Sequence, residues 1–354
     1  MMESLLGKTL DELKTLVSAL DMPGFTAGQI ANWLYRKRIA SIDEMSDISL
    51  AHRSRLKEAC ETGRRQPARK QESADGTVKY LFPVSGNRFI ESVYIPDKDR
   101  ATLCVSSQAG CKLSCLFCMT GKQGFSGQLT AGEMLNQVLS IPESGRLTNL
   151  VFMGMGEPLD NTGELFKAIE LLTAGYGFAW SPKRITVSTV GIIPGLVRFL
   201  KELKVHLAVS LHSPFPDERR SLMPVEKAYP MTDILKLLRQ YDFAHQRRLS
   251  FEYILFGGLN DDLKHATALA ALLKGMPCRV NLIRYHAVPD VPLQASDAGA
   301  MSRFQEYLNS KGIICTIRAS RGEDILAACG MLSGEARCLK DAQGDRGGTA
   351  AFIF

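Results

Sequence analysis

The chain has 354 residues, of which 45% are hydrophobic and 23% are charged, and its formal net charge at pH 7 is +6. This composition is ordinary for a soluble globular protein, no apolar run approaches the length of a membrane span, and the first 21 residues mix charges among their leucines, which excludes a signal peptide. We therefore expect a cytoplasmic protein of one large barrel or two to three modest domains, with its nine cysteines reduced unless they do chemistry.

Residues 1 to about 70 have the pattern of a small helical domain. The segment 11–20 is amphipathic, and Thr26 is suited to cap a helix over 27–37 in which Ile30, Trp33 and Leu34 form an apolar face. A further helix or pair of helices is expected over 41–60. Basic residues outnumber acidic ones by ten to five between residues 31 and 70, so this domain is a candidate clamp for nucleic acid, although charge runs are usually solvated helix faces.

The hydrophobic period changes after this helical domain. Residues 77–83 and 88–95 alternate apolar and polar side chains, and Asp75-Gly76 and Ser85-Gly86-Asn87 are turn sequences. A β-hairpin over 71–100 is therefore expected to lead into the next domain.

From residue 101 onward, short β-branched runs alternate with amphipathic stretches. The expected strands cover 102–106, 149–153, 184–188, 206–210, 250–256 and 279–285. The expected helices cover 130–141, 164–173, 194–203, 232–241 and 261–274. Repeated β-then-α units imply parallel strands with right-handed crossovers, so the fold predicted for 101–310 is a partial (βα)6 barrel. A strand over 315–319 and a helix that starts near Glu323 complete a C-terminal part, 311–354.

The chemistry of such a barrel is expected at the carboxyl ends of its strands, where the loops converge. Four polar motifs follow the first four predicted strands. They are the cysteine loop after the first strand, Gly154-Met155-Gly156-Glu157-Pro158 after the second, Ser188-Thr189 at the end of the third and Ser210-Leu211-His212 at the end of the fourth. These independent placements on one rim predict a single site.

Cys111, Cys115 and Cys118 stand in the run Cys-x-x-x-Cys-x-x-Cys. Thiolates hold iron–sulfur clusters, and a loop that offers three of them leaves one iron of a cubane open. That iron can be chelated by S-adenosylmethionine (SAM), and the spacing resembles the radical SAM signature. The alternative is a zinc site with Cys104 as fourth ligand, but structural zinc usually draws on two separated ligand pairs.

Other residues of the four motifs are suited to bind SAM. Gly156 allows a ligand close to the backbone, and the Glu157 carboxylate can accept a hydrogen bond from an ammonium group. Ser188, Ser210 and His212 can contact a ribose and a carboxylate. Taken alone, each of these residues is equally compatible with a capped strand end or a satisfied polar group.

The cluster loop, Cys111-Lys-Leu-Ser-Cys115-Leu-Phe-Cys118-Met-Thr-Gly, resembles that of the RlmN/Cfr family of radical SAM RNA methyltransferases. Further matches follow in order along almost the whole chain. They are Trp33-Leu-Tyr-Arg-Lys37, Glu91-Ser-Val-Tyr-Ile-Pro96, Ala101-Thr-Leu-Cys104, Met153-Gly-Met-Gly-Glu-Pro158 and Ile325-Leu-Ala-Ala-Cys329-Gly330.

The resemblance implies methylation of carbon 2 of an adenine in 23S ribosomal RNA, at the peptidyl transferase centre, and in transfer RNA next to the anticodon. It implies a [4Fe-4S] cluster on Cys111, Cys115 and Cys118, with SAM as the second cofactor. Cys329 would carry the methyl group, because a thiolate is a competent nucleophile, and Cys104 would resolve the protein–RNA adduct by forming a transient disulfide. Glu91 would take the proton from carbon 2.

The resemblance also extends the list of SAM and RNA contacts. Leu211 belongs to the SAM-binding rim, and His286 stands where the family more often has an Asn that helps hold SAM. Charge reversal at Arg64 and Arg65 is expected to weaken RNA binding. The target base must be turned out of its stack, and the free-energy cost of this step is lowest in RNA loops, which are therefore the expected substrates. We expect flavodoxin or ferredoxin as electron donor, a monomer and no membrane contact.

Three alternatives remain open at this point. The same chemistry can be aimed at adenine carbon 8, a non-catalytic RNA-binding protein can hold a structural or redox-sensing cluster, and a radical enzyme can form a different product. The remaining cysteines match no family motif, so core packing is expected for Cys60, Cys278, Cys315 and Cys338.

Overall fold

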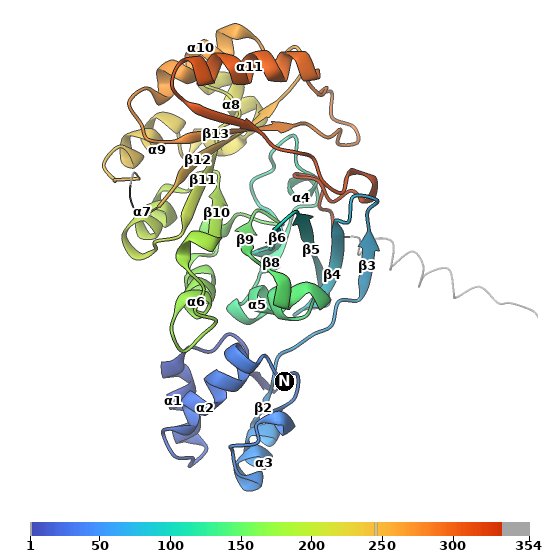
Figure 1. Cartoon of the computed structure of the whole chain (residues 1–354), viewed down its shortest axis with the longest axis vertical. Helices are drawn as coiled ribbons and strands as arrows, with labels where there is room; N and C mark the ends of the chain where they lie inside the picture. The colour runs from blue at the N-terminus through green and yellow to red at the C-terminus, as the bar shows by residue number, and fades with distance from the viewer. Residues whose placement is uncertain (1, 244, 246, 335–354) are drawn as a thin grey trace, which may run out of the picture.

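The computed structural model describes residues 2–243, 245 and 247–334, and it consists of a helical module below a larger α/β body (Figure 1). The module contains β1 (Glu3–Ser4), α1 (Leu10–Ala19), α2 (Thr26–Ala31), the π-helical turn η1 (Asn32–Lys37), the 3-10 turn η2 (Ile42–Glu44), α3 (Leu50–Ala59) and β2 (Cys60–Glu61). β1 and β2 form a parallel pair that joins the two ends of the module.

The helices of the module begin in two different ways. α1 starts at a capping box, in which Thr9 Oγ1 accepts from the Glu12 amide and the Glu12 carboxylate accepts from the Thr9 amide. The predicted cap at Thr26 is wrong. Thr26 is the first residue of α2, and its side chain is buried and caps no amide. Its own amide donates to the Pro23 carbonyl oxygen in the preceding turn (2.9 Å).

One ten-stranded sheet forms the body, in the order β14-β13-β12-β11-β10-β9-β6-β5-β4-β3. β3 to β6 pair antiparallel, which confirms the predicted hairpin, and every pair from β6 to β14 is parallel. The strands are β3 (Arg69–Glu72), β4 (Val78–Val84), β5 (Arg88–Asp97), β6 (Arg100–Cys104), β9 (Asn149–Phe152), β10 (Ile185–Thr189), β11 (His206–Ser210), β12 (Leu249–Leu255), β13 (Arg279–Arg284) and β14 (Ile314–Ile317). The sheet does not close, since β3 and β14 are its two edges.

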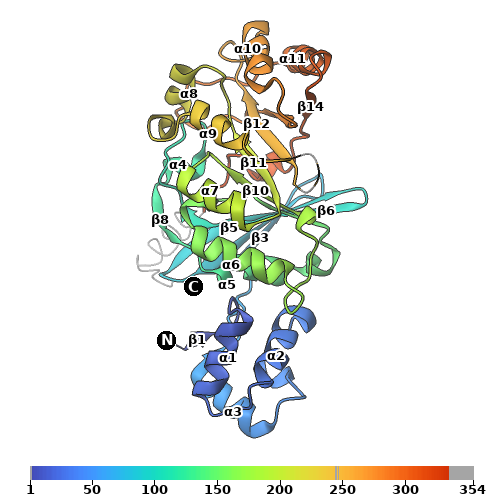
Figure 2. The same ribbon diagram turned by 90° about the vertical axis from the view of Figure 1, so that its left-hand side faces the viewer.

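Helices connect the parallel strands and, apart from the short helix that follows the cysteine loop, cover the outer face of the sheet (Figure 2). They are α4 (Met119–Lys122), α5 (Ala131–Leu139), α6 (Thr162–Thr173), α7 (Ile193–Glu202), α8 (Pro216–Leu222), α9 (Met231–Leu238), α10 (Leu263–Leu273) and α11 (Ala298–Ser310), with the 3-10 turns η3 (Pro142–Arg146), η4 (Pro158–Asp160), η5 (Pro182–Arg184) and η6 (Pro224–Lys227). A small hairpin of β7 (Gln108–Gly110) and β8 (Phe125–Gln128) flanks the cysteine loop. The predicted partial α/β barrel is therefore confirmed, with α4, α8 and α11 as helices that the sequence pattern did not indicate.

The helix predicted near Glu323 is wrong within the described residues. Only the 3-10 turn η7 (Glu323–Ile325) forms there, between Gly322 and Leu326, whose φ angles are +63° and +53°. An α-helix needs negative φ at every residue, so this left-handed pair ends the turn at both sides. The chain then runs to residue 334 as a loop, named here the Cys329 loop (326–334).

The helical module docks against α5 by close backbone contact. A Cβ atom on Gly132 would lie 2.4 Å from the Leu6 carbonyl oxygen, and one on Gly7 would lie 2.4 Å from the Gly132 amide nitrogen. Arg64 strengthens this junction, because its guanidinium donates to Ser140 Oγ (2.9 Å) and to the Leu139 carbonyl oxygen (2.7 Å).

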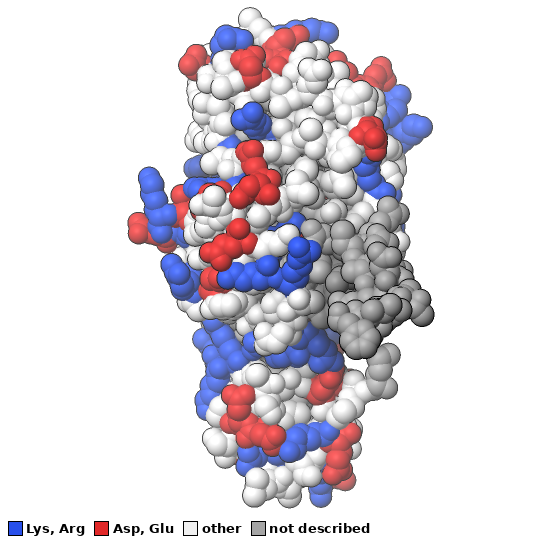
Figure 3. Space-filling model, turned by 90° about the vertical axis from the view of Figure 1, so that its right-hand side faces the viewer, with Lys and Arg blue, Asp and Glu red and all other residues white. Residues whose placement is uncertain are grey.

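Lys and Arg side chains form a band where the module meets the body (Figure 3). All ten basic residues counted between 31 and 70 have an intramolecular partner, such as the Gly175 carbonyl for Arg36 and the Glu61 carboxylate for Arg65. Arg64 therefore contributes to the junction between module and body. Weaker RNA binding after charge reversal at Arg64 and Arg65 remains a prediction, and reversal at Arg64 would also remove these junction contacts.

Substitution of Gly132 by Ala should destabilise the protein by about 1–3 kcal/mol, because the new methyl group overlaps the Leu6 backbone. Gly28→Ala is the matched control, since nothing lies within 4 Å of its added Cβ in α2, and helix propensity makes that change neutral or stabilising. Urea unfolding of the two variants tests this. Equal stability of Gly132→Ala and the parent would contradict the close docking.

Candidate active site

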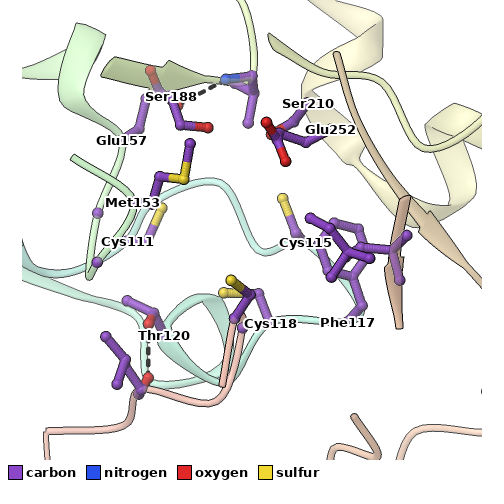
Figure 4. Close-up of a pocket in the computed structure, with 18 of the residues that line it drawn as sticks. Cys111, Cys115, Phe117, Cys118, Thr120, Met153, Glu157, Ser188, Ser210 and Glu252 are labelled. Atoms are coloured by element: carbon purple, nitrogen blue, oxygen red, sulfur yellow. Dashed lines mark hydrogen bonds between the residues drawn. The ribbon is translucent and has the colours of Figure 1, made fainter. Parts of the chain in front are cut away.

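A cavity of about 190 Å³ opens at the carboxyl ends of the parallel strands. Cys111, Cys115 and Cys118 line it, and Figure 4 shows their sulfur atoms around its centre, with Glu157 on one side and Ser210 and Glu252 on the other. The structure thus brings the three signature cysteines together, on the rim where the strand order predicted them.

Backbone hydrogen bonds shape the cysteine loop. The Cys111 amide donates to the Gly124 carbonyl at 3.1 Å, and the Cys118 amide donates to the Cys115 carbonyl at 3.1 Å, just before α4. The Leu116 amide donates to the Leu222 carbonyl at 2.9 Å, which ties the loop to the end of α8. The loop is consequently held at both ends and in the middle before any ligand enters.

The donor set fits the expected iron–sulfur cluster. Burial raises the pKa of the Cys111 thiol to about 12 and raises the pKa values of Cys115 and Cys118 too, so all three need a nearby positive charge to ionise. Iron supplies that charge, because thiolates are its ligands in such clusters. In the described part of the chain, no group of three or more His, Cys, Asp and Glu side chains is arranged to hold a single metal ion.

Glu157 is the buried carboxylate of the cavity. Its oxygens accept from the Thr189 hydroxyl (2.5 Å), the Val190 amide (3.0 Å) and the Leu159 amide (3.0 Å), which joins the loops after β9 and β10. Burial raises its pKa to about 7, although these three donors oppose the shift. Gly156 precedes it with φ of +95°, and a Cβ there would lie 2.4 Å from Gln108 Cβ, so glycine serves the packing of this turn.

The other predicted SAM contacts divide into two groups. Ser188, Ser210 and His212 line the cavity. His212 is neutral, because burial lowers its pKa to about 3, and its Nδ1 accepts from the Ile254 amide at 3.1 Å. Leu211 does not line the cavity, since its side chain is fully buried in the core. His286 also lies outside it, where its Nε2 and Ser320 Oγ are 3.1 Å apart, because β13 ends at Arg284 and the chain turns away.

Cys104 and Cys329 line the same cavity as the three signature cysteines. Burial raises the pKa of Cys104 to about 12. Cys329 is accessible to solvent through the cavity although protein surrounds it; this confinement raises the pKa of its thiol, and Arg318 opposes that effect. Cys60 and Cys315 are buried in the core and Cys278 packs against it, whereas Cys338 lies outside the described residues.

The Cys329 loop rests on the cysteine loop and on the hairpin. The Gly330 and Leu332 carbonyls accept from the Met119 amide (2.8 Å) and the Thr120 hydroxyl (2.7 Å). Glu91 lies outside the main cavity, where its carboxylate accepts from the Ser333 amide (2.8 Å) and pairs with buried Lys79 (3.3 Å). Glu91 therefore holds the loop in this conformation and is not turned toward the cysteines.

Two charged residues of the cavity escaped the sequence reasoning. Glu252 is buried on β12, where its carboxylate accepts from Asn281 Nδ2 (2.7 Å) and lies 3.4 Å from Arg318 Nη1. Glu252 raises the pKa of Arg318. A single acid inside the otherwise apolar strand Leu249–Leu255 was the available signal, since an unpaired carboxylate is rarely buried.

A fully buried ion pair holds the rim of the cavity in place. The Arg219 guanidinium pairs with Glu226 and donates to the carbonyl oxygens of Val190, Ser210 and Leu211 at 3.1 Å each. Burial lowers the pKa of Arg219, and the Glu226 charge opposes that shift. One side chain thus links the ends of β10 and β11 to the segment between α8 and α9.

Comparison with known proteins agrees with this geometry. A family model of the radical SAM superfamily matches residues 105–270. The structure of a radical SAM methyltransferase from Sphaerobacter thermophilus superposes with a TM-score of 0.89 at 38% identity, covering 94% of this chain and 99% of that one. The fold and the cavity therefore define a radical SAM enzyme, a class that uses a [4Fe-4S] cluster and SAM.

The N-terminal module narrows the assignment. A family model described as the ribosomal RNA large subunit methyltransferase N-terminal domain matches residues 3–62. The chain is 62% identical over 329 residues to the probable dual-specificity RNA methyltransferase RlmN of Parabacteroides distasonis, covering 93% of this chain and 96% of the relative. It is 42% identical over 332 residues to the dual-specificity RNA methyltransferase RlmN of Syntrophus aciditrophicus, with 93% and 95% coverage. The chain belongs to the RlmN family.

SAM affinity should rise with pH if Glu157 receives the SAM ammonium group. Its pKa of about 7 means that the carboxyl group is mostly neutral at lower pH and ionised at higher pH. A cation favours the ionised form, so affinity should increase about tenfold from roughly pH 6 to pH 8. Equilibrium binding of SAM to the reconstituted protein measures this, and Glu157→Gln should bind weakly without that dependence. A flat profile in the parent would contradict the contact.

Loss of the buried Glu226 charge should destabilise the protein strongly. Glu226→Gln leaves the Arg219 guanidinium buried without its anion, so the free energy of unfolding should fall by about 3–5 kcal/mol. The exposed pair of Arg220 and Asp217 is the control, and Asp217→Asn should cost less than about 1 kcal/mol. Urea unfolding compares the two variants. Similar decreases in the free energy of unfolding would show that the buried pair stabilises the protein no more than the exposed pair does.

Proposed function

We propose that this protein methylates carbon 2 of an adenine in 23S ribosomal RNA and in transfer RNA, using Cys329 as a methyl carrier. The supporting observation is that Cys104 and Cys329, which are far apart in the sequence, line one cavity with Cys111, Cys115 and Cys118. Membership of the RlmN family supports RNA as the substrate, since its relatives are described as dual-specificity RNA methyltransferases.

We propose Cys111, Cys115 and Cys118 as the ligands of the [4Fe-4S] cluster, and Gly156, Glu157, Ser188, Ser210 and His212 as SAM contacts. When bound, the cluster and SAM supply a methyl group and a carbon radical that removes hydrogen. The residues of the chain then have to position the methyl carbon, the Cys329 sulfur and the proton on carbon 2 of the adenine. The apolar lining, which includes Phe117, Val190 and Ile254, limits the water that reaches them, although Cys329 itself is accessible to solvent.

Cys329 accepts the methyl group: its thiol loses a proton, and a sulfur–carbon bond forms as the donor's sulfur–carbon bond breaks. After that carbon has joined the adenine, Cys104 attacks the Cys329 sulfur. A disulfide forms between the two cysteines while the bond from Cys329 to carbon breaks; the carbon keeps the electron pair of that bond and takes up a proton to become the methyl group. A reductant later restores both thiols. Both cysteines border the cavity, which supports this exchange.

Glu91 is the proposed base for the proton on carbon 2. Its carboxylate is occupied by the Ser333 amide, so the role requires the Cys329 loop to release that bond when RNA enters. Leu326 and Gly330, which lie on either side of Cys329, have left-handed φ angles. A backbone rotation at either residue would change the direction of the loop. Loop movement would therefore couple the arrival of substrate to the availability of the base.

The alternatives differ in product. The relatives do not favour either carbon-8 methylation or a non-catalytic cluster protein. Mapping the methyl position on RNA modified by the purified protein separates carbon 2 from carbon 8. For the setting, we propose a cytoplasmic monomer that receives electrons from flavodoxin or ferredoxin. None of the helices in the described part of the chain combines the length and apolarity needed to span a bilayer.

Peptide mass spectrometry of protein purified anaerobically from cells tests the methyl carrier. One added methyl group is expected on Cys329, and it should disappear when Cys111, Cys115 and Cys118 are replaced by Ala. Cys278→Ser is the matched control, because Cys278 is half-buried outside the cavity, and this variant should keep the methyl group. An unmodified Cys329 in protein with an intact cluster and SAM would remove the proposal's main support.

A further inference from the structure

A second hollow, of about 520 Å³, lies at the opposite ends of the strands from the cysteine cavity. His206 begins β11, Arg279 begins β13, and Arg248 directly precedes β12. Lys183, in the turn before β10, and Arg247 add two more basic side chains to its wall. Among the described residues that line this hollow, there is no Asp or Glu, so the lining itself carries a net positive charge.

Most of these cations are available to a ligand. Arg248, Arg279 and Lys183 are exposed, and within the described residues their cationic groups have no hydrogen bond or ion pair. Arg247 is different, since its guanidinium donates to the carbonyls of Leu200 and Leu203 and closes the end of α7. Three cations therefore line one hollow with no anionic side chain among the described residues beside them in its wall.

His206 adds a neutral donor beside the cations. Its Nδ1 accepts from the Arg248 amide at 2.9 Å, so the ring hydrogen lies on Nε2. Burial and the charges of Arg248, Lys183 and Arg279 lower its pKa to about 4, which keeps the ring neutral. Such a group can donate a hydrogen bond to a phosphate oxygen without adding to the local charge repulsion.

The basic residues lie on the inner face of the sheet, the same face as the cysteines. Side chains alternate along a strand, so Arg248 shares a face with Glu252, and Arg279 shares a face with Ile283. Glu252 and Ile283 both line the cysteine cavity. The inner face is therefore polar and basic at the amino ends of the strands and bears the cysteines at the carboxyl ends.

A third hollow, of about 410 Å³, shares Cys104, Arg318 and Cys329 with the cysteine cavity and extends from there toward the basic residues. It extends along β6 from Arg100 at one end to Cys104 at the other, and Cys329 and Arg318 also line it. Burial lowers the pKa of Arg248, repulsion from Arg279, Arg100 and Arg318 adds to this effect, and the Glu252 charge opposes it. Mutual repulsion of this kind is relieved when a polyanion neutralises the charges.

We propose that the inner face of the sheet binds the ribose–phosphate backbone of the substrate RNA, with Arg248 and Arg279 as phosphate ligands and Arg100 leading the strand toward Cys329. The proposal rests on the proposed function, because it assigns a second RNA contact to the same reaction. It also explains how RNA is held when the basic residues of the helical module are mostly engaged within the protein.

An acidic reductant is the other polyanion that a basic hollow could receive. The observations favour RNA, because the hollow lies at the amino ends of the strands while the proposed cluster ligands lie at their carboxyl ends. A reductant bound there would be separated from the cluster by the length of the sheet. RNA is long enough to follow the inner face from one end to the other.

The test compares binding of an unmodified tRNA transcript by fluorescence anisotropy over a range of salt concentrations. The double variant Arg248→Gln/Arg279→Gln should lose about tenfold in affinity, and the slope of log affinity against log salt should become shallower by about 1.4, or about 0.7 for each lost phosphate contact. Arg248→Lys/Arg279→Lys should retain the parent slope because it keeps both charges. Arg303→Gln, on the exposed surface of α11, is the matched control.

The outcomes separate this proposal from the proposed function. An unchanged slope in the Gln variant, with methylation of the transcript by the parent intact, overturns the proposal and leaves the function standing. Unchanged RNA binding with slower reduction by flavodoxin assigns the hollow to the reductant and also overturns it. Equal losses in the Gln and Lys variants, with lowered melting temperatures, indicate a structural role and overturn it too. Absence of methylation by the parent counts against the proposed function instead.

Discussion

The buried ion pair of Arg219 and Glu226 is the interaction on which the active-site rim depends. Parallel strands present unpaired carbonyl groups at their carboxyl ends, and these must be satisfied if the loops are to enclose a cavity. Arg219 satisfies three of them, from Val190, Ser210 and Leu211, and its charge is balanced by Glu226. The guanidinium suits this position because its fixed planar array of donors can serve several acceptors at once.

The same sheet divides its inner face between two kinds of chemistry. At the carboxyl ends, five cysteines lie among apolar side chains, where burial raises thiol pKa values and few cations lie near. At the amino ends, the hollow is lined by three arginines and a lysine, and none of the described residues in its lining is an Asp or Glu. The carboxyl ends therefore surround the cysteines with mostly apolar side chains, whereas the amino ends favour an anionic ligand. The Cys329 loop lines the cysteine cavity and contacts both the cysteine loop and the hairpin.

Much of the fold could be predicted because local patterns coincide with tertiary burial. The strands of the barrel carry β-branched runs, and the structure has them within a few residues of their predicted positions, as in 206–210, which matches β11. α8 and α11 escaped prediction, since α8 is a short helix of seven residues and α11 has a smaller share of apolar residues than the predicted helix α10. The predicted C-terminal helix failed for a local reason, because left-handed residues at 322 and 326 confine the turn.

The sequence by itself determined the chemistry, since the cysteine spacing and its neighbours specify which thiols can share one cluster, and the order of strands and loops specifies the rim on which they lie. Tertiary structure alone decided which polar side chains meet. It brought Cys104 and Cys329 to one cavity, turned His286 away from it, engaged Arg64 in the module junction and collected Arg248 and Arg279 in one hollow. The physical reason is that spacing along the chain sets contacts only within one element. Contacts between elements depend on how strands pair and how loops pack, and a single side-chain position does not encode them.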